Sequence, residues 1–212
     1  MRVIAGRSRG RALRAPPGST TRPTADRVRE AIFDMLGSLV ELRGATVADL
    51  FAGSGAMGIE ALSRGARAAA FVDRSAGALR TVRSNLAAAG LAPAPATIVR
   101  ADVLAWLSRE AARTGRPPQR FDLALCDPPY AFVAWGELLG RLDASVAVLE
   151  SNRPLEVPER WKVIRCKRYG GTLVTVVRAA GTQPSDESHD NGDGRDATGL
   201  RTTPDSKQRG MS

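Results

Sequence analysis

From residue 45 onward, apolar residues follow two alternating periodicities, which predict strands and helices in turn. Short continuous apolar runs are typical of buried strands, and apolar residues spaced three and four apart are typical of one helix face. The predicted strands are 46–51, 68–72, 97–99, 121–126 and 146–149. The predicted helices are 56–64, 75–89, a segment through Leu104 and Leu107, and 135–142. This alternation predicts a mostly parallel sheet with helices on both faces.

The segments on either side of this region follow other patterns. Before it, Pro23 and Thr24 predict a helix with Thr24 as its N-cap. The apolar stripe of that helix is Val28, Ile32, Met35 and Leu39. Arg27 and Arg29 lie off the stripe, so we expect both to remain in solvent.

At the other end, residues 162–168 and 172–178 flank the turn Tyr169-Gly170-Gly171 and predict a hairpin. The predicted fold class is therefore α/β: a Rossmann-like, seven-stranded, mostly parallel sheet closed by an antiparallel C-terminal hairpin. This arrangement is typical of methyltransferases that depend on S-adenosylmethionine (SAM).

Charge is distributed unevenly along the 212 residues. The chain has 31 Lys and Arg against 22 Asp and Glu, a net charge of +9, and residues 1–29 hold +7 of it. A basic surface favours polyanions, because neutralised phosphates release counterions. We therefore expect residues 1–21 to form a small basic N-terminal extension, either a hairpin turned at Gly6 and Gly10 or an arm. The later elements can build a core without it, so we expect the fold to survive removal of residues 2–14.

Composition also sets the domain boundaries and excludes several classes of protein. We expect residues 22–178 to form one domain and residues 179–212, which are poor in apolar residues, to be a disordered tail. Cys126 and Cys166 lack metal or redox spacing, and the only histidine, His189, lies in the tail, so no metal site is expected. No apolar run is long enough to span a membrane, and the first residues lack the apolar core of a signal peptide. We expect a cytoplasmic monomer with no membrane contact.

The first motif with chemical content runs from Asp49 to Gly58, at the end of a predicted strand, and contains G-x-G-x-x-G. Its glycines allow a tight turn and a close approach of the backbone to a ligand. Asp73 ends the next strand, where a carboxylate can bind ribose hydroxyls. NAD binding is one interpretation, but Asp49 just before the glycines suits the cationic amino group of SAM. Asp102, after the third strand, is placed either to contact adenine or to cap a helix. The predicted cofactor residues are Asp49, Phe51, Ala52, Gly53, Ser54, Gly55, Asp73, Arg74, Asp102 and Val103.

The second motif is Asp127-Pro128-Pro129-Tyr130, which follows an apolar strand. The two prolines stiffen the backbone, so the Pro128 carbonyl is fixed beside the Asp127 carboxylate. An exocyclic amino group presents two donors that match these two acceptors, and Tyr130 offers a flat face on which a base can stack. These four residues are the predicted catalytic residues, against the plainer interpretation of a turn-forming loop.

Together these stretches resemble a known family. Residues 22–33, 49–66 and 127–130, with the opening residues 1–11, are similar to the RsmD family of bacterial 16S rRNA (guanine-N2)-methyltransferases, which act at guanine 966. The resemblance covers residues 1 to about 178. The SAM loop is common to many methyltransferases, but the Arg-Pro-Thr helix combined with Asp-Pro-Pro-Tyr is more specific.

The resemblance implies a role for each motif. Asp49, Gly53 and Gly55 would line the methionine end of SAM, Asp73 would hold the ribose and Asp102 the adenine. Residues 127–130 would grip the target guanine. The basic N-terminal residues would bind rRNA within the 30S subunit or a late assembly intermediate. The residues expected to contact nucleic acid are Arg2, Arg7, Arg9, Arg11, Arg14 and Arg22.

Three alternatives stay open at this point. An adenine-N6 methyltransferase acting on DNA or RNA would use the same Asp-Pro-Pro-Tyr chemistry. A cytosine-C5 enzyme would need a nucleophilic cysteine, and Cys126, the nearest candidate, has a strand position that favours packing. A non-catalytic assembly factor that retains SAM binding would not need residues 127–130.

Overall fold

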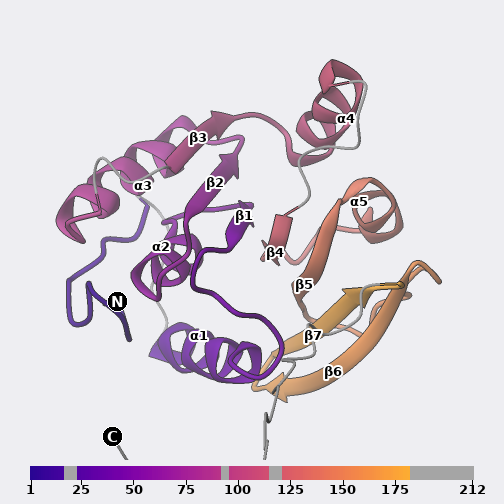
Figure 1. The fold of residues 1–212 in the computed structure, drawn as a ribbon, viewed down its shortest axis with the longest axis horizontal. Coiled ribbons are helices and arrows are strands. Elements are labelled where there is room, and N and C mark those ends of the chain that lie inside the picture. The colour runs from indigo at the N-terminus through magenta and orange to yellow at the C-terminus, as the bar shows by residue number, and fades with distance from the viewer. Residues whose placement is uncertain (17–22, 92–95, 115–120, 182–212) are drawn as a thin grey trace, which may run out of the picture. The chain divides into compact units, whose positions relative to one another are not determined.

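A seven-stranded sheet runs through the part of the chain that the computed structural model describes, which is residues 1–16, 23–91, 96–114 and 121–181. Its strands are β1 (Thr46–Leu50), β2 (Ala68–Asp73), β3 (Ala96–Arg100), β4 (Phe121–Cys126), β5 (Ala144–Ser151), β6 (Trp161–Tyr169) and β7 (Thr172–Ala179). They lie in the order β3-β2-β1-β4-β5-β7-β6 (Figure 1). The strands β1 to β5 are parallel, and β7 pairs antiparallel with both β5 and β6. The predicted mostly parallel sheet closed by an antiparallel hairpin is confirmed.

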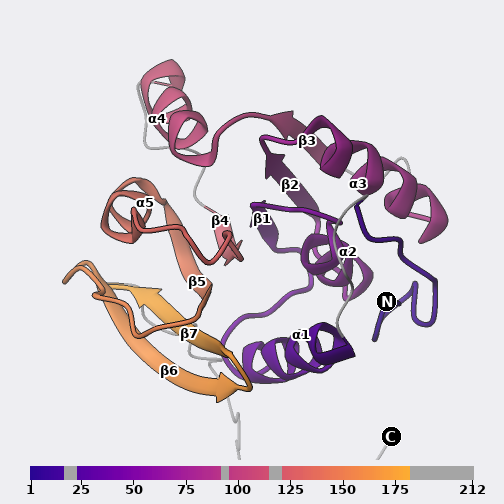
Figure 2. The same ribbon diagram turned by 180° about the vertical axis from the view of Figure 1, so that it is seen from behind.

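Helices cover both faces of the sheet (Figures 1 and 2). They are α1 (Pro23–Leu36), α2 (Ala56–Ser63), α3 (Ala76–Ala88), α4 (Val103–Thr114) and α5 (Trp135–Arg141). Side chains of α1, α2 and α3 pack in one apolar cluster with Val47 and Leu125 of the sheet. Side chains of α4 and α5 pack in a second cluster with Ala48 and Leu149. Because neighbouring strand residues point to opposite faces, each buried strand supplies both clusters.

The structure corrects two details of the first helix. It begins at Pro23, one residue before the predicted cap Thr24, and proline suits the first helical position because its missing N–H needs no partner there. Arg27 is exposed as predicted, but Arg29 is buried. The Arg29 guanidinium lies 3.3 Å from the Asp26 carboxylate and donates a hydrogen bond to the Arg2 carbonyl. The expectation that Arg29 stays in solvent was wrong, because a single sequence does not show the partners that a distant segment supplies.

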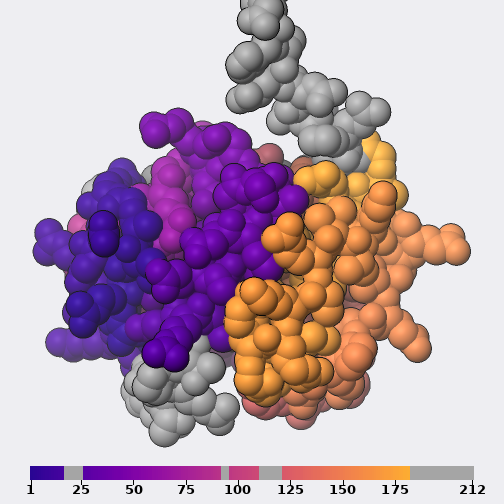
Figure 3. Space-filling view, turned by 90° about the horizontal axis from the view of Figure 1, so that it is seen from below, coloured from indigo at the N-terminus to yellow at the C-terminus, as the bar shows by residue number. Residues whose placement is uncertain are grey.

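Residues 1–13 fold back on themselves and pack against the domain. The Val3 N–H donates to the Arg11 carbonyl and the Gly10 N–H donates to the Val3 carbonyl, both at 2.9 Å. Val3 and Leu13 are buried in the same apolar cluster as α1 and α2. Figure 3 shows this segment, in indigo, on the same face of the molecule as α1 and the β6–β7 hairpin.

Polar groups of α2 fix the backbone of this segment. Glu60 is fully buried, and its carboxylate accepts hydrogen bonds from the Ile4 N–H at 2.8 Å and the Ala5 N–H at 2.9 Å. The Ser63 hydroxyl accepts from the Ser8 N–H at 3.0 Å. Removing the segment would leave a buried carboxylate without two of its donors, which is costly. The core therefore includes residues of this segment, contrary to the expectation that the later elements build it alone, and the effect of removing residues 2–14 stays a prediction.

The predicted C-terminal boundary shifts slightly. Strand β7 extends to Ala179, which pairs with Trp161, so Ala179 belongs to the sheet rather than to the predicted tail. Residues 182–212 of that tail, residues 17–21 of the predicted extension, and Arg22 lie outside the described residues. No helix in the described part of the chain is long and apolar enough to cross a membrane.

Candidate active site

The two predicted motifs meet at the point where the strand order reverses. From β1 the sheet continues to β2 and β3 on one side and to β4 and β5 on the other. Ligands of open parallel sheets bind beyond the carboxyl ends of the strands at such a point. Asp49 on β1 pairs with Leu125 on β4, and Leu50 pairs with Cys126. Asp127, the next residue, therefore emerges beside the turn that follows β1.

The turn after β1 has an unusual backbone. Phe51 has a φ of 63°, and it is the only non-glycine residue with positive φ in the described part of the chain. This conformation costs about 1–2 kcal/mol for a residue with a side chain. Gly53 and Gly55 also have positive φ, at 54° and 74°. Three left-handed residues within five bend the backbone sharply, which is suited to a close approach by a ligand.

Contacts on both sides hold this turn in place. The Phe51 ring packs edge-on against Phe132, with ring centroids 5.2 Å apart. The Asp73 carboxylate accepts the Gly53 N–H at 2.9 Å, and the Asn85 amide donates to the Ser54 carbonyl at 2.9 Å. The predicted cofactor residues 51–55 thus form one fixed turn, with Ala52 buried and the others at least partly so.

Gly58, the third glycine of the motif, allows α2 to approach the sheet. A Cβ at this position would lie 2.4 Å from the Phe71 ring and 3.0 Å from Asp49 Oδ2. Only glycine fits at that distance. Its N–H donates to Asp49 Oδ2 at 2.9 Å, so this glycine also orients the carboxylate.

Asp49 is a buried acid without a cation beside it. Only 4% of the residue is exposed, and loss of hydration raises the pKa of its carboxyl to about 8. The Gly58 hydrogen bond opposes this shift, and the nearby Asp127 and Asp73 add to it. A positively charged ligand group next to Asp49 would stabilise the charged carboxylate and lower this pKa.

The remaining predicted cofactor residues lie at the ends of β2 and β3. Asp73 also accepts the Ser75 N–H at 2.7 Å, and Arg74 is exposed. Asp102 Oδ1 accepts the Ala105 N–H at 3.0 Å, so Asp102 caps α4, which begins at the buried Val103. The capping interpretation of Asp102 is confirmed, and contact with adenine stays a prediction.

The Asp-Pro-Pro-Tyr motif follows β4 at this end of the sheet. Asp127 is accessible to solvent, but nearby protein atoms partly desolvate its carboxyl and raise its pKa to about 6. Pro128 is buried, while Pro129 and Tyr130 are exposed. The Pro129 carbonyl accepts the Phe132 N–H at 2.8 Å, which closes a tight turn. Tyr130 is 50% exposed, and its hydroxyl lies 3.5 Å from the Thr172 hydroxyl. A large aromatic side chain exposed beside a carboxylate is suited to stacking with a base.

Glu150 is a site residue that sequence reasoning missed. Cys126 pairs with Leu149, so Asp127 and Glu150 lie side by side at the ends of β4 and β5. Burial, and then the charges of Asp127 and Asp49, raise the pKa of Glu150 well above its usual value. Glu150 directly follows the apolar run 146–149, just as Asp127 directly follows the apolar strand 121–126. This shared position was the sequence signal that could have identified Glu150 as a site residue.

The N-terminal segment carries a group of basic side chains. Arg2, Arg7, Arg9, Arg11 and Arg14 are all exposed. None forms an ion pair with another described residue. They are therefore available to a polyanion. The described residues contain no group of three or more His, Cys, Asp or Glu arranged to hold a metal ion.

Sequence comparison identifies the family. A family model described as conserved hypothetical protein 95 matches residues 1–178. The chain belongs to this family. YlbH of Bacillus subtilis (strain 168), which is provisionally named an rRNA methyltransferase, is 40% identical over 192 residues, covering 85% of this chain and 100% of the relative. Ribosomal RNA small subunit methyltransferase D of Escherichia coli (strain K12) is 34% identical over 152 residues, covering 72% of this chain and 68% of the relative. The resemblance to the RsmD family is confirmed.

Solved structures agree with this membership. YhhF of Escherichia coli, provisionally described as a methyltransferase, superposes with a TM-score of 0.71 at 29% identity, covering 84% of this chain and 97% of that one. SMU.776, solved in complex with S-adenosylhomocysteine (SAH), has a TM-score of 0.60 at 16% identity, covering 75% of this chain and 50% of that one. The latter likeness shows a shared fold. The predicted methyltransferase fold class is confirmed.

Proposed function

We propose that this protein transfers a methyl group from SAM to the exocyclic N2 amino group of a guanine in 16S rRNA. The expected target is guanine 966, on the 30S subunit or a late assembly intermediate. The observation that carries the proposal is the position of Asp127. It emerges from β4 at the reversal of strand order, beside the turn after β1 and the buried carboxyl of Asp49.

The described residues fit SAM as the cofactor. Asp49 is buried, and the ammonium group of a ligand would offset the free-energy cost of holding its carboxylate charged there. The turn 51–55 allows the backbone to approach a ligand closely. Asp73 stands at the end of β2, where an acid can bind ribose hydroxyls. The neighbour SMU.776 was solved with SAH, the product of SAM after transfer. When bound, SAM supplies an electrophilic methyl group, and the products are SAH and N2-methylguanine.

The target base must leave its stack to reach this site, as in other enzymes that modify bases. Tyr130 is half exposed and offers the surface on which the base would lie. The Asp127 carboxylate and the Pro128 carbonyl would accept the two amino protons and orient the nitrogen lone pair. Positioning of this kind is the main contribution that the chain makes to the rate.

The amino group loses one proton when it is methylated. The Asp127 carboxylate is the acceptor nearest to that nitrogen in the proposed arrangement. Its pKa of about 6 allows it to take the proton transiently near neutral pH and to release it to solvent, which reaches Asp127. Glu150 lies beside Asp127, and burial together with the nearby Asp127 charge holds the pKa of Glu150 well above its usual value.

The RNA partner is supported by charge and by family. The exposed arginines of residues 1–14 lack ion pairs within the described chain, and a relative in the family is named a small-subunit rRNA methyltransferase. The substrate test compares labelled methyl transfer from SAM to unmodified 30S subunits, free 16S rRNA and duplex DNA. We expect transfer to 30S subunits or 16S rRNA, with none to DNA. Transfer to DNA alone would contradict the proposed substrate.

A further inference from the structure

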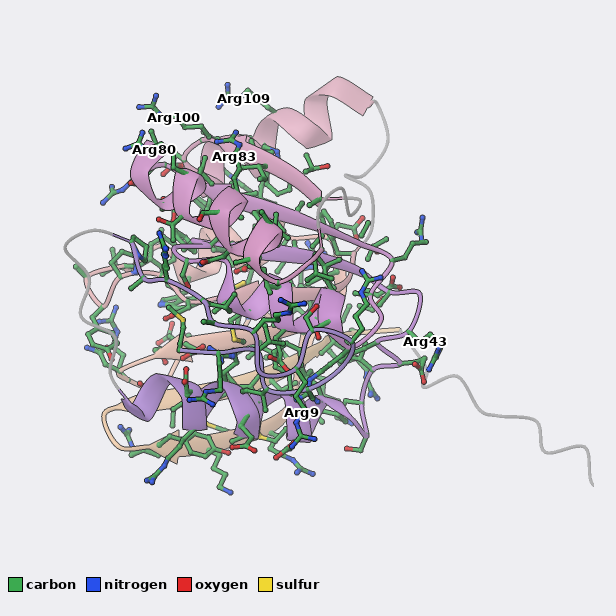
Figure 4. The ribbon with its side chains drawn as sticks, turned by 90° about the vertical axis from the view of Figure 1, so that its left-hand side faces the viewer. Arg9, Arg43, Arg80, Arg83, Arg100 and Arg109 are labelled. Carbon is green, nitrogen blue, oxygen red and sulfur yellow. The ribbon has the colours of Figure 1, made fainter. Side chains whose placement is uncertain are left out.

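A second basic surface lies around the β3 edge of the sheet, where Arg100 pairs with Asp73 of β2. It consists of Arg80 and Arg83 on α3, Arg100 at the end of β3, and Arg109 on α4, here called the β3-edge patch. All four are exposed. Figure 4 shows the four side chains gathered at the top of the view, with Arg43 at its right-hand edge and Arg9 near its foot. Because α3 and α4 cover different faces, the patch wraps around the edge strand.

Among the described residues, these guanidinium groups lack an acidic partner. None of the four forms an ion pair with any residue that the structure describes. Of the nearby acids, Asp73 accepts two backbone N–H groups and Asp102 caps α4, and neither forms an ion pair with a described arginine. Unpaired arginines present fork-shaped donors that match phosphate oxygens.

We propose that the β3-edge patch binds phosphates of the substrate RNA at a second site, distinct from the N-terminal arginines. This rests on the proposed function, since it assigns a further contact to the same substrate. The register of the strands supports this proposal. One row of paired residues crosses the sheet from β4 to β3, through Cys126, Leu50, Val72 and Val99. Arg100, which follows Val99, therefore lies at the level of Asp127, which follows Cys126. Three strand spacings separate β4 from β3, a distance of about 14 Å, which a few nucleotides span.

The N-terminal segment contacts the helix that carries two residues of the patch. Asn85 on α3 accepts the Arg14 N–H at 2.8 Å and donates to the Arg14 carbonyl at 2.9 Å. Arg14 therefore lies against the helix that carries Arg80 and Arg83.

RNA fits this surface better than an acidic protein does. Protein interfaces have apolar or aromatic residues at their centre. The exposed large hydrophobic residues of the described chain are Tyr130, Val133 and Val163, and none lies on α3, β3 or α4. A surface of arginines without an apolar centre is typical of phosphate binding.

The test uses the full-length protein and charge-matched pairs of substitutions. The variants are Arg80→Ala with Arg83→Ala, and Arg100→Ala with Arg109→Ala. The control is Arg43→Ala with Arg67→Ala, two exposed arginines that precede β1 and β2 at the opposite ends of the strands. Fluorescence titration with 16S rRNA fragments at several salt concentrations gives the log–log slope of affinity against salt.

We expect each patch pair to flatten this slope by roughly 1.4–1.8, because each lost phosphate contact contributes roughly 0.7–0.9. The control pair should leave the slope unchanged, and SAM affinity should be unchanged in all three variants. Equal slopes for patch and control variants would overturn the proposal.

Two further outcomes are informative. Arginines on an edge strand can instead serve to prevent pairing with other chains. Increased self-association of the patch variants with an unchanged RNA slope would establish that role and overturn the RNA site. If the wild-type protein binds RNA through the patch but methylates no rRNA, the proposed function fails while the patch stands.

Discussion

Asp73 Oδ2 accepts a hydrogen bond from the Gly53 N–H at 2.9 Å, which ties the end of β2 to the turn after β1. The other oxygen accepts the Ser75 N–H at 2.7 Å. Each carboxylate oxygen has two acceptor positions, so both can still receive a ribose hydroxyl. Asp73 therefore holds the turn that we propose receives SAM, and it can contact the same ligand.

Replacing Asp73 should weaken SAM binding without changing which base is methylated. We expect Asp73→Ala to cost on the order of 1–3 kcal/mol, or roughly 5–150-fold in Kd, the scale of a lost charged hydrogen bond. Asp73→Asn keeps one acceptor and should lose less. Titration calorimetry measures both. Unchanged SAM affinity, or tight binding of NADH in place of SAM, would refute the cofactor assignment.

SAM binding should release a proton through Asp49. Its carboxyl has a pKa of about 8 without a cation nearby, so it is mostly protonated at pH 7. The ligand ammonium group stabilises the charged carboxylate, and the proton leaves. Calorimetry in two buffers of different ionisation enthalpy should give close to one proton released at pH 7, falling as pH rises above about 8. An equal enthalpy in both buffers would contradict this role of Asp49.

The same shift affects stability in the absence of ligand. A carboxyl whose pKa is raised on folding stabilises the protein below its unfolded value of 3.8, and this stabilisation is lost as pH rises to about 8. Asp49→Asn should therefore raise Tm relative to the wild type more at pH 8 than at pH 5. Thermal melts at both values, with the exposed Asp34→Asn as control, test the sign.

Removing the Asp127 carboxylate should stop transfer and leave SAM affinity nearly intact. Loss of one orienting acceptor should lower the single-turnover rate on the order of 10²-fold or more. In the wild type, that rate should rise with pH through about 6, because the charged carboxylate is the accepting form. Asp34→Ala serves as the control. Near-normal turnover by Asp127→Ala would remove Asp127 from the proposed mechanism.

The N-terminal segment contains a matched pair of glycines. Gly6 and Gly10 have φ values of 81° and 82°, but a Cβ on Gly6 would lie 2.0 Å from the Ser63 carbonyl oxygen, whereas one on Gly10 meets nothing within 4 Å. Gly10→Ala should cost about 1–2 kcal/mol for the left-handed backbone alone. Gly6→Ala should cost about 1–3 kcal/mol more, because the segment must move away from α2. Urea unfolding measures the difference, and equal losses would show that the segment does not need this contact.

Most of the fold could be predicted because local patterns determine it. Phe121–Cys126 matches its predicted range, and the other core strands differ by one or two residues at their ends. Continuous apolar runs require burial on both faces, and glycines end helices for local steric reasons. The predicted turn at Gly170 and Gly171 also joins β6 to β7 as expected.

Apart from the shifted ends of α1 and β7, the misses depend on contacts between distant parts of the chain. Arg29 is buried because Arg2 and Asp26 supply its partners, and Glu60 is buried because Ile4 and Ala5 donate to it. Glu150 joins the site through the pairing of β4 with β5. Motif spacing identified Asp49 and Asp127. It could not identify the partners of Arg29, Glu60 and Glu150, because those partners are brought close by the pairing of elements that lie far apart in the chain.

The central claim is tested most directly by identifying the methylated nucleoside. Unmodified 30S subunits are incubated with the protein and SAM labelled on its methyl group, and the digested rRNA is separated into nucleosides. The account predicts that the label appears as N2-methylguanosine, and that Asp127→Ala leaves the rRNA unlabelled. Label in N6-methyladenosine or 5-methylcytidine, or no transfer to rRNA, would contradict it.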